Sequence, residues 1–119
     1  MKIKNFKDFL LGTTEKLIFK LRDTIFFLQT FLQKKPNDID IETTIDTFVE
    51  TTQKLIQNNT RFKQLTYGYY NETINDIEKV IKILSDNEEY ILQNKDFDEK
   101  DDLIKLLSNI NIYTEQPRW

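Results

Sequence analysis

The stretch LIFKLRDTIFFLQTFL, residues 17–32, determines the fold class that the sequence predicts. Ten of its sixteen residues are apolar, and they recur with spacings of three and four rather than two. That period is typical of an α-helix and argues against a β-strand. The residues expected to share one buried face are Leu17, Leu21, Ile25, Leu28, Phe31 and Leu32, with Ile18 at its edge.

Three phenylalanines in this stretch do not fit that face. At 100° per residue, Phe19 and Phe26 lie on roughly the opposite side of the helix, and Phe27 lies between the two sides. A helix that is apolar on two sides is either central in its domain or in contact with something outside it. The sequence leaves both alternatives open, and under the second the phenylalanines bind a partner or a second copy of the chain.

Two helices are expected in the first half of the chain. The first begins near Ile3 and ends before Pro36, because proline cannot continue a helix, and Gly12 is its weak point. A second helix with one narrow apolar stripe follows. Either Asp38 or Asp40 can act as its N-cap by accepting hydrogen bonds from the first free N–H groups.

The second half predicts two more helices. The apolar residues of 61–94 keep one helical phase, which predicts a single long helix. Residues 67–71, which include a glycine, and residues 85–88, which have the spacing of a capping box, are expected to bend this helix without reversing it. Asp98 or Asp101 can cap a last, shorter helix.

Four amphipathic segments with short connectors predict an all-α fold. We expect an antiparallel, up-down four-helix bundle with long first and third helices. Residues 1–113 would form this single bundle domain, and residues 114–119, which show no period, would form a flexible C-terminal tail. A chain of 119 residues fits one domain with a core of its own.

The amino-acid composition indicates the cellular compartment in which the chain is expected. The chain contains no Cys, His or Ala, and Lys greatly outnumbers Arg, which is the pattern expected from a low-GC genome. The lack of cysteine removes any disulfide framework and fits a reducing compartment. The N-terminal residues do not follow the pattern of a signal peptide, and no run is apolar for long enough to span a bilayer. We therefore expect a cytoplasmic protein.

Charge is distributed unevenly along the chain, whose net charge is −3. Residues 1–35 carry eight basic and three acidic side chains, a net charge of +5, and they hold six of the nine phenylalanines. Residues 36–119 carry a net charge of −8. One interpretation is that the two parts attract each other within the fold. The other is that the basic, Phe-rich part faces an acidic partner or an anionic membrane surface.

The residue types needed for most catalytic and metal sites are missing. Without His or Cys there is no usual catalytic triad, thiol nucleophile or zinc site, and the chain has no Gly-rich phosphate loop. Acidic residues 96, 98 and 102 alternate like the start of a calcium loop, but Lys100 and Leu107 occupy two ligand positions. We interpret this segment as a capped helix start, and we expect no enzyme activity, cofactor or metal.

Aromatic and basic residues also occur together at 61–63 and 67–70, a combination that single-stranded nucleic acid can use. The surrounding sequence is acidic, however, whereas nucleic-acid binders usually present a basic field. On the helical wheel Phe62, Tyr69 and Tyr70 lie on or near the apolar face, and only Tyr67 points well away from it. We interpret the first three as core aromatics and Tyr67 as a candidate contact residue.

These observations predict a small, non-enzymatic protein-binding module that acts by occlusion, alone or as a homodimer. Bacteriocin immunity proteins and phage-encoded inhibitors are similar to it in size and composition, although no motif supports the likeness. The alternative is a peripheral membrane protein that uses the basic, Phe-rich N-terminal helix. The expected partner-binding residues are Phe19, Phe26, Phe27, Tyr67 and Trp119.

Overall fold

The computed structural model describes residues 13–34, 38–57, 59–66 and 68–110. These residues are helical with short connections and include no strand, which confirms the predicted all-α class. The helices in them are α2 (Thr13–Lys34), α3 (Ile41–Gln57), α4 (Asn59–Leu65), α5 (Tyr70–Asp86), α6 (Glu88–Leu92) and α7 (Lys100–Asn109).

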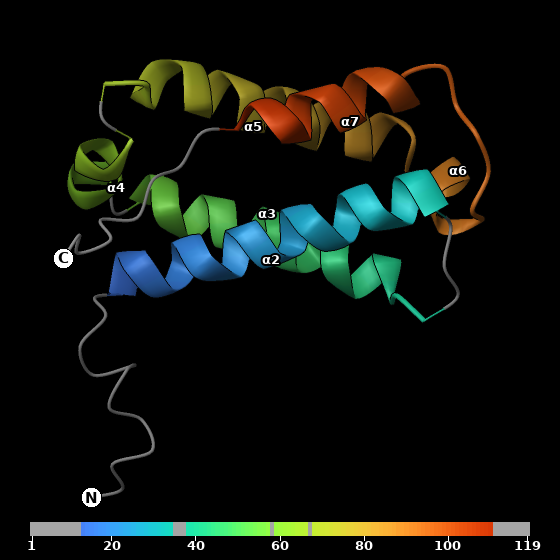
Figure 1. Ribbon diagram of the computed structural model, residues 1–119, viewed down its shortest axis with the longest axis horizontal. Helices are drawn as coiled ribbons and strands as arrows, with labels where there is room; N and C mark the ends of the chain where they lie inside the picture. The colour runs from blue at the N-terminus through green and yellow to red at the C-terminus, as the bar shows by residue number, and fades with distance from the viewer. Residues whose placement is uncertain (1–12, 35–37, 58, 67, 111–119) are drawn as a thin grey trace, which may run out of the picture.

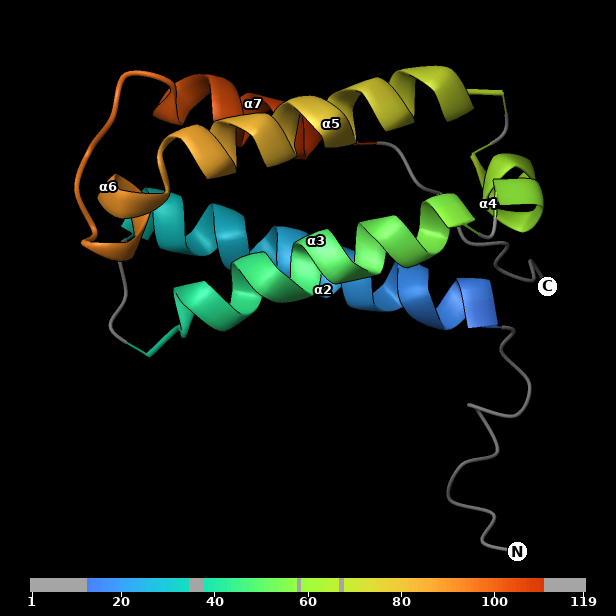
Figure 2. The ribbon, with the colours of Figure 1, turned by 180° about the vertical axis from the view of Figure 1, so that it is seen from behind.

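The four longest helices form two layers (Figure 1). Helices α2 and α3 run antiparallel in one layer, and α5 and α7 run antiparallel in the other. Helix α2 lies beside α7, and α3 lies beside α5, as the view from behind also shows (Figure 2). The short helices α4 and α6 lie at opposite ends of the two layers.

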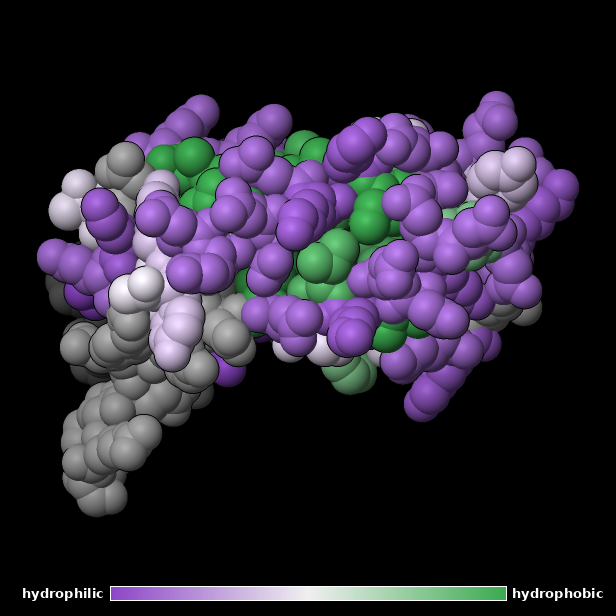
Figure 3. Space-filling model, turned by 90° about the horizontal axis from the view of Figure 1, so that it is seen from above, coloured by the Kyte–Doolittle hydropathy of each residue, from purple (hydrophilic) through white to green (hydrophobic). Residues whose placement is uncertain are grey.

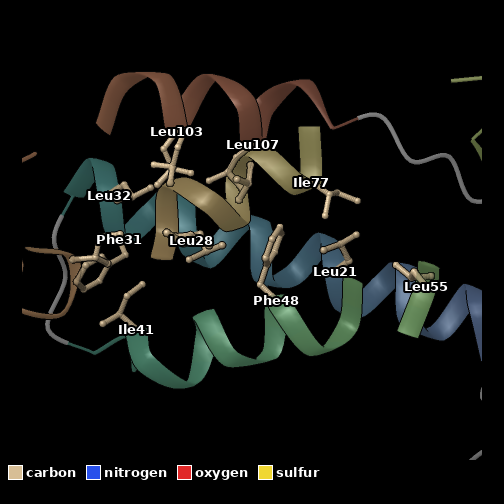
Figure 4. Packing of buried hydrophobic residues seen from close by; sticks show 14 of the residues in the cluster. Leu21, Leu28, Phe31, Leu32, Ile41, Phe48, Leu55, Ile77, Leu103 and Leu107 are labelled. Atoms are coloured by element: carbon tan, nitrogen blue, oxygen red, sulfur yellow. The ribbon is translucent and has the colours of Figure 1, made fainter. Parts of the chain in front are cut away.

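The core lies between the layers and uses the face of α2 that the sequence predicts. Leu21 and Leu28 are fully buried in one cluster with Phe48 of α3, Ile77 of α5 and Leu107 of α7 (Figure 4). Leu17 and Ile25 are only partly buried, whereas Ile18, which was expected at the edge of this face, is fully buried. The apolar side chains that α2 contributes to the buried cluster are Ile18, Leu21, Leu28, Phe31 and Leu32.

Buried threonines fill positions where helices often place alanine. The hydroxyl groups of Thr24, Thr52 and Thr66 each donate a hydrogen bond of 2.8–2.9 Å to the backbone carbonyl three residues earlier. A threonine that is satisfied in this way can be buried without the cost of an unpaired polar group. No buried side-chain nitrogen or oxygen in the described residues lacks a hydrogen-bond partner.

The expected long first helix is not confirmed. Helix α2 spans Thr13–Lys34 and ends, as predicted, before Pro36. The expected start near Ile3, the weak point at Gly12 and the tail 114–119 lie outside the described residues.

The prediction of one long helix over 61–94 is wrong, because the chain forms α4, α5 and α6 there. Helix α4 lies across one end of the molecule, and the chain then turns into the second layer (Figure 1). Gly68 permits this turn because its φ is +90°, a conformation that other residues rarely adopt. The chain changes direction at this turn, but the helical spacing of the apolar residues continues across it. The reason is that α4 and α5 both bury their apolar faces against the same core.

The second interruption also differs from the prediction. Ser85 lies within α5 and does not cap a new helix, so the predicted capping box is wrong. Asn87 separates α5 from α6, and its side-chain amide donates to the carbonyl of Ile83 at 2.9 Å and to the carboxylate of Glu99 at 3.1 Å. Asn87 therefore links the end of α5 to the residue before α7. The predicted arrangement of four helices is thus confirmed only as an all-helical fold.

Asp40 is the N-cap of α3, which decides between the two predicted candidates. Its Oδ1 accepts a hydrogen bond from the backbone N–H of Thr43 at 3.1 Å, and its Oδ2 accepts one from the Thr43 hydroxyl at 2.8 Å. The backbone bond contributes most to holding the pKa of Asp40 below its ordinary value of 3.8, since it favours the charged carboxylate. The last helix starts differently from the prediction, because Glu99 precedes it and makes no side-chain cap bond.

Asp40→Asn is expected to lower the melting temperature at neutral pH. The pKa is lowered in the folded chain, so the charge stabilises the fold fully above 3.8 and this contribution is lost as the pH falls through the lowered value. The difference from wild type, followed by circular dichroism, should therefore shrink as the pH falls below 3.8. Asp46→Asn, an exposed change on the same helix, is the control. A difference that does not depend on pH would contradict the assignment.

Gly68→Ala is expected to destabilise the fold by about 1–2 kcal/mol, because a Cβ is unfavourable at positive φ. A Cβ at Gly68 would have no atom within 4 Å, so the effect tests backbone conformation rather than steric fit. Urea unfolding of Gly68→Ala beside Ser85→Ala, a change within a regular helix, measures it. An alanine variant as stable as wild type would show that no left-handed turn is needed between α4 and α5.

Candidate functional site

The outer face of α2 exposes the three phenylalanines that the first interpretation would have buried. Phe19 is 37% exposed, Phe26 63% and Phe27 43%. Within the described residues, the alternative in which a central helix encloses all three is therefore wrong. Tyr67 and Trp119, the other predicted contact residues, lie outside the described residues.

The three rings form one elongated feature along the helix. The rings of Phe26 and Phe27 meet edge to face, with centroids 5.9 Å apart and an interplanar angle of 64°. Phe19 precedes Phe26 by seven residues, about two turns or roughly 10 Å along the helix axis. Phe19 and Phe26 therefore point in nearly the same direction, opposite Leu21 and Leu28 of the core.

Basic side chains surround this aromatic feature. The exposed charged residues of α2 are Lys16, Lys20, Arg22, Asp23 and Lys34. Four of these are basic and one is acidic, so their net charge is +3. Glu15, the other acidic residue of α2, is only 14% exposed and forms an ion pair with Arg61 of α4. We use the name α2 outer face for the three phenylalanines together with these five exposed charged residues.

The neighbouring helix α3 presents an acidic flank. Lys54 donates a 2.9 Å hydrogen bond to Glu50, and this bond is the main cause of the lowered pKa of Glu50. The positive charge of Lys20 on α2 lowers that pKa further, which places the edge of the α2 outer face near α3. The Lys20–Glu50 attraction joins a basic residue of 1–35 to an acidic residue of 36–119, whereas the Glu15–Arg61 ion pair joins an acidic residue of the first part to a basic residue of the second.

A second surface feature is a groove between α5 and α7. Its volume is about 430 Å³, and its lining residues are Lys79, Lys82, Ile83, Glu99, Asp102, Lys105, Leu106 and Asn109. Figure 3 looks onto this side of the molecule and shows apolar surface between rows of polar side chains. Both basic and acidic groups line the groove, and Lys82 is paired with Asp86 at 3.1 Å. The groove thus lacks both exposed aromatic rings and a single sign of charge.

Sequence reasoning missed this groove. The only sequence feature that could have indicated it is the pair of lysines at 79 and 82 beside Ile83, which form a basic edge along the apolar face of α5. The pairing of α5 with α7, which creates the groove, is not encoded in any local pattern. Tyr90 and Leu92 on α6, which are 52% and 39% exposed, were likewise not predicted as surface residues.

Of the aromatic residues considered for nucleic-acid binding, Phe62 and Tyr70 pack against the core. Phe62 is fully buried, and its ring meets that of Tyr70 edge to face at 5.8 Å. Lys63 lies 5.8 Å from the centroid of the half-buried Tyr70 ring. Tyr69 is 53% exposed, so its expected place near the core is wrong. With Phe62 enclosed, the described part of this segment offers no row of rings on which bases could stack.

The segment that resembles the start of a calcium loop serves a structural role. Lys100 donates a 2.9 Å hydrogen bond to Asp96, which joins the connector to the first turn of α7. The described residues contain no group of three acidic, His or Cys side chains that could hold a metal ion. None of the described helices is long and apolar enough to cross a membrane.

Comparison of the chain with protein families finds no matching family, and comparisons with curated proteins and with solved structures find no matching protein or structure. The α2 outer face combines three exposed phenylalanine rings, among them Phe26, the most exposed large hydrophobic side chain of the described residues, with mostly basic charged side chains. Exposed clusters of large apolar side chains commonly mark sites of interaction.

Phe26→Ser is expected to change the free energy of unfolding by less than about 1 kcal/mol, because most of the ring is already in water. Phe31→Ala on the same helix is the matched comparison. Phe31 is only 6% exposed, so its truncation should cost about 3–5 kcal/mol. Urea unfolding of both variants tests the orientation of α2, and a large loss for Phe26→Ser would contradict it.

Proposed function

We propose that the chain is a non-enzymatic protein-binding module of the cytoplasm, an inhibitor, immunity or accessory factor that acts by occlusion. The observation that supports this proposal is the exposure of Phe19, Phe26 and Phe27 along a single helix whose opposite face fills the core. In such a module the bound chain covers a functional surface of its partner and performs no chemistry on it.

The energetics of burial favour this use of the α2 outer face. Covering the 63% of Phe26 that is exposed would remove on the order of 120 Å² of apolar surface from water, worth about 3 kcal/mol. Phe19 and Phe27 add smaller amounts. Interfaces usually depend on a few such aromatic anchors surrounded by polar contacts that exclude water. The basic residues around the rings would supply that polar rim and orient the partner.

The rigidity of α2 also suits an occluding surface. Its buried face is held by the core, so Phe19 and Phe26 are presented on a helix that is already ordered before binding. Less conformational entropy is lost on association when the contact residues are preorganised. A site on a packed helix of 22 residues is therefore better suited to tight binding than one on a connector.

A second candidate function is peripheral association with an anionic membrane, again through α2. The presence of lysine and phenylalanine side chains on one exposed helix face favours it. The leucine-rich face of α2 is used by the core, however, so among the described residues of α2 only Phe19, Phe26 and Phe27 are large, exposed apolar side chains that could enter a bilayer. We therefore rank protein binding first.

The double variant Phe19→Ser, Phe26→Ser tests the protein-binding function. Affinity capture from the cells that naturally make the chain, read by mass spectrometry, should recover partners with wild type and lose them with this variant. Light scattering over a range of concentrations reports any self-association in the same samples. Tyr90→Ser is the matched control, because the Tyr90 ring on α6 is 52% exposed. This variant should still capture the partners.

Circular dichroism must show that the double variant is folded, so that lost capture is attributed to the surface. A folded double variant that retains both the captured partners and the wild-type mass would overturn the assignment of this surface.

A further inference from the structure

The sign of charge on the α2 outer face distinguishes among the partners it could bind. Its exposed charged residues have a net charge of +3, whereas residues 36–119 carry −8. Glu15 of α2 is largely buried and paired with Arg61. Its negative charge therefore contributes little to the electrostatic potential of the α2 outer face. The surface on which the phenylalanines lie is thus basic on a chain that is acidic elsewhere.

The basic residues lie on both sides of the aromatic row. At 100° per residue, Lys16 and Lys20 fall on the side that faces α3, and Arg22 falls on the side that faces α7, where Gln29 donates a 2.8 Å hydrogen bond to Ser108. Phe26 lies between them. An apolar row with like charges along both edges has the layout of a helix that pairs with an oppositely charged amphipathic partner.

A second copy of the chain does not fit this surface well. In a two-fold symmetric dimer the same patch meets itself, so the basic residues of one copy would approach basic residues of the other. Asp23 is the only exposed acidic residue of α2 available to offset them. Contact of the α2 outer face with the acidic side of another copy is head-to-tail, which gives open chains unless the rotation closes a ring.

We propose, on the basis of the protein-binding function above, that the α2 outer face binds an acidic amphipathic helix presented by a different protein. Apolar side chains of that helix, spaced by three and four residues, cover Phe19, Phe26 and Phe27. Carboxylates of that helix face Lys16 and Lys20 along one edge of the aromatic row. The affinity then depends on the rings, while the charges set the orientation and make binding sensitive to salt.

The experiment uses the full chain labelled with ¹⁵N and a synthetic helical peptide about five turns long. The peptide has leucine at positions spaced three and four apart and glutamate at most others. Its counterpart has lysine in place of glutamate. Amide chemical shifts report where each peptide binds, and titrations at low and at moderate salt give the affinities. Sonicated vesicles that contain phosphatidylserine serve as the membrane probe.

The acidic peptide should bind at least about tenfold more tightly than the basic one, with the largest shifts in α2, and more weakly as salt is raised. Lys16→Gln with Lys20→Gln should weaken binding about three- to tenfold. Lys79→Gln with Lys105→Gln changes the net charge equally in the α5–α7 groove and should alter binding less than about twofold.

Several results would overturn the proposal. Equal binding of the acidic and basic peptides, with loss of both in Phe26→Ser, rejects the acidic partner but leaves the occlusion function standing. Binding of the acidic peptide that Phe26→Ser does not weaken removes the surface proposed for both. Absence of binding by the acidic peptide rejects the inference, and tighter binding to the vesicles assigns the face to a membrane instead.

Discussion

Burial of one face of α2 is the constraint on which the rest of the structure depends. Leu21 and Leu28 are fully enclosed where α2 meets α3 and the second layer, and Phe48 and Leu107 are buried beside them. A helix can direct only part of its circumference into such a core. The leucines fit between the layers, so any further apolar side chain of α2 must face outwards. The exposure of the phenylalanines therefore follows from the packing of the leucines.

The core contains buried threonine side chains in addition to aliphatic and aromatic ones. Helices α2 and α3 contain no alanine, and threonine is a poorer helix former. Thr24 and Thr52 are nevertheless buried, because each hydroxyl is satisfied by a carbonyl of its own helix. The side chain then presents mainly its methyl group to the neighbouring helix. Helical stability in this chain consequently comes from tertiary packing more than from local propensity.

The two exposed features of the fold differ in their chemistry. The α2 outer face presents rings and a net positive charge, while the α5–α7 groove has a modest apolar floor between charges of both signs. Mixed charge is typical of a solvated surface between paired helices. A predominantly basic surface around exposed rings favours a partner of opposite charge. The distribution of charge along the sequence does not by itself indicate a binding surface. The fold identifies the basic residues that lie on the same face as Phe26.

The amino-acid pattern by itself determined the helical class, the buried face of α2, the end of that helix before Pro36 and the exclusion of His- or Cys-based sites. It also identified Phe19, Phe26 and Phe27 as misplaced for that face, since these properties depend on the periodicity and chemistry of neighbouring residues. Only the tertiary structure decided that 61–94 forms three helices and that the phenylalanines are exposed. Periodicity records which side of a segment is apolar, but the direction of the chain after Gly68 and the helix that covers each face depend on contacts between residues distant in sequence.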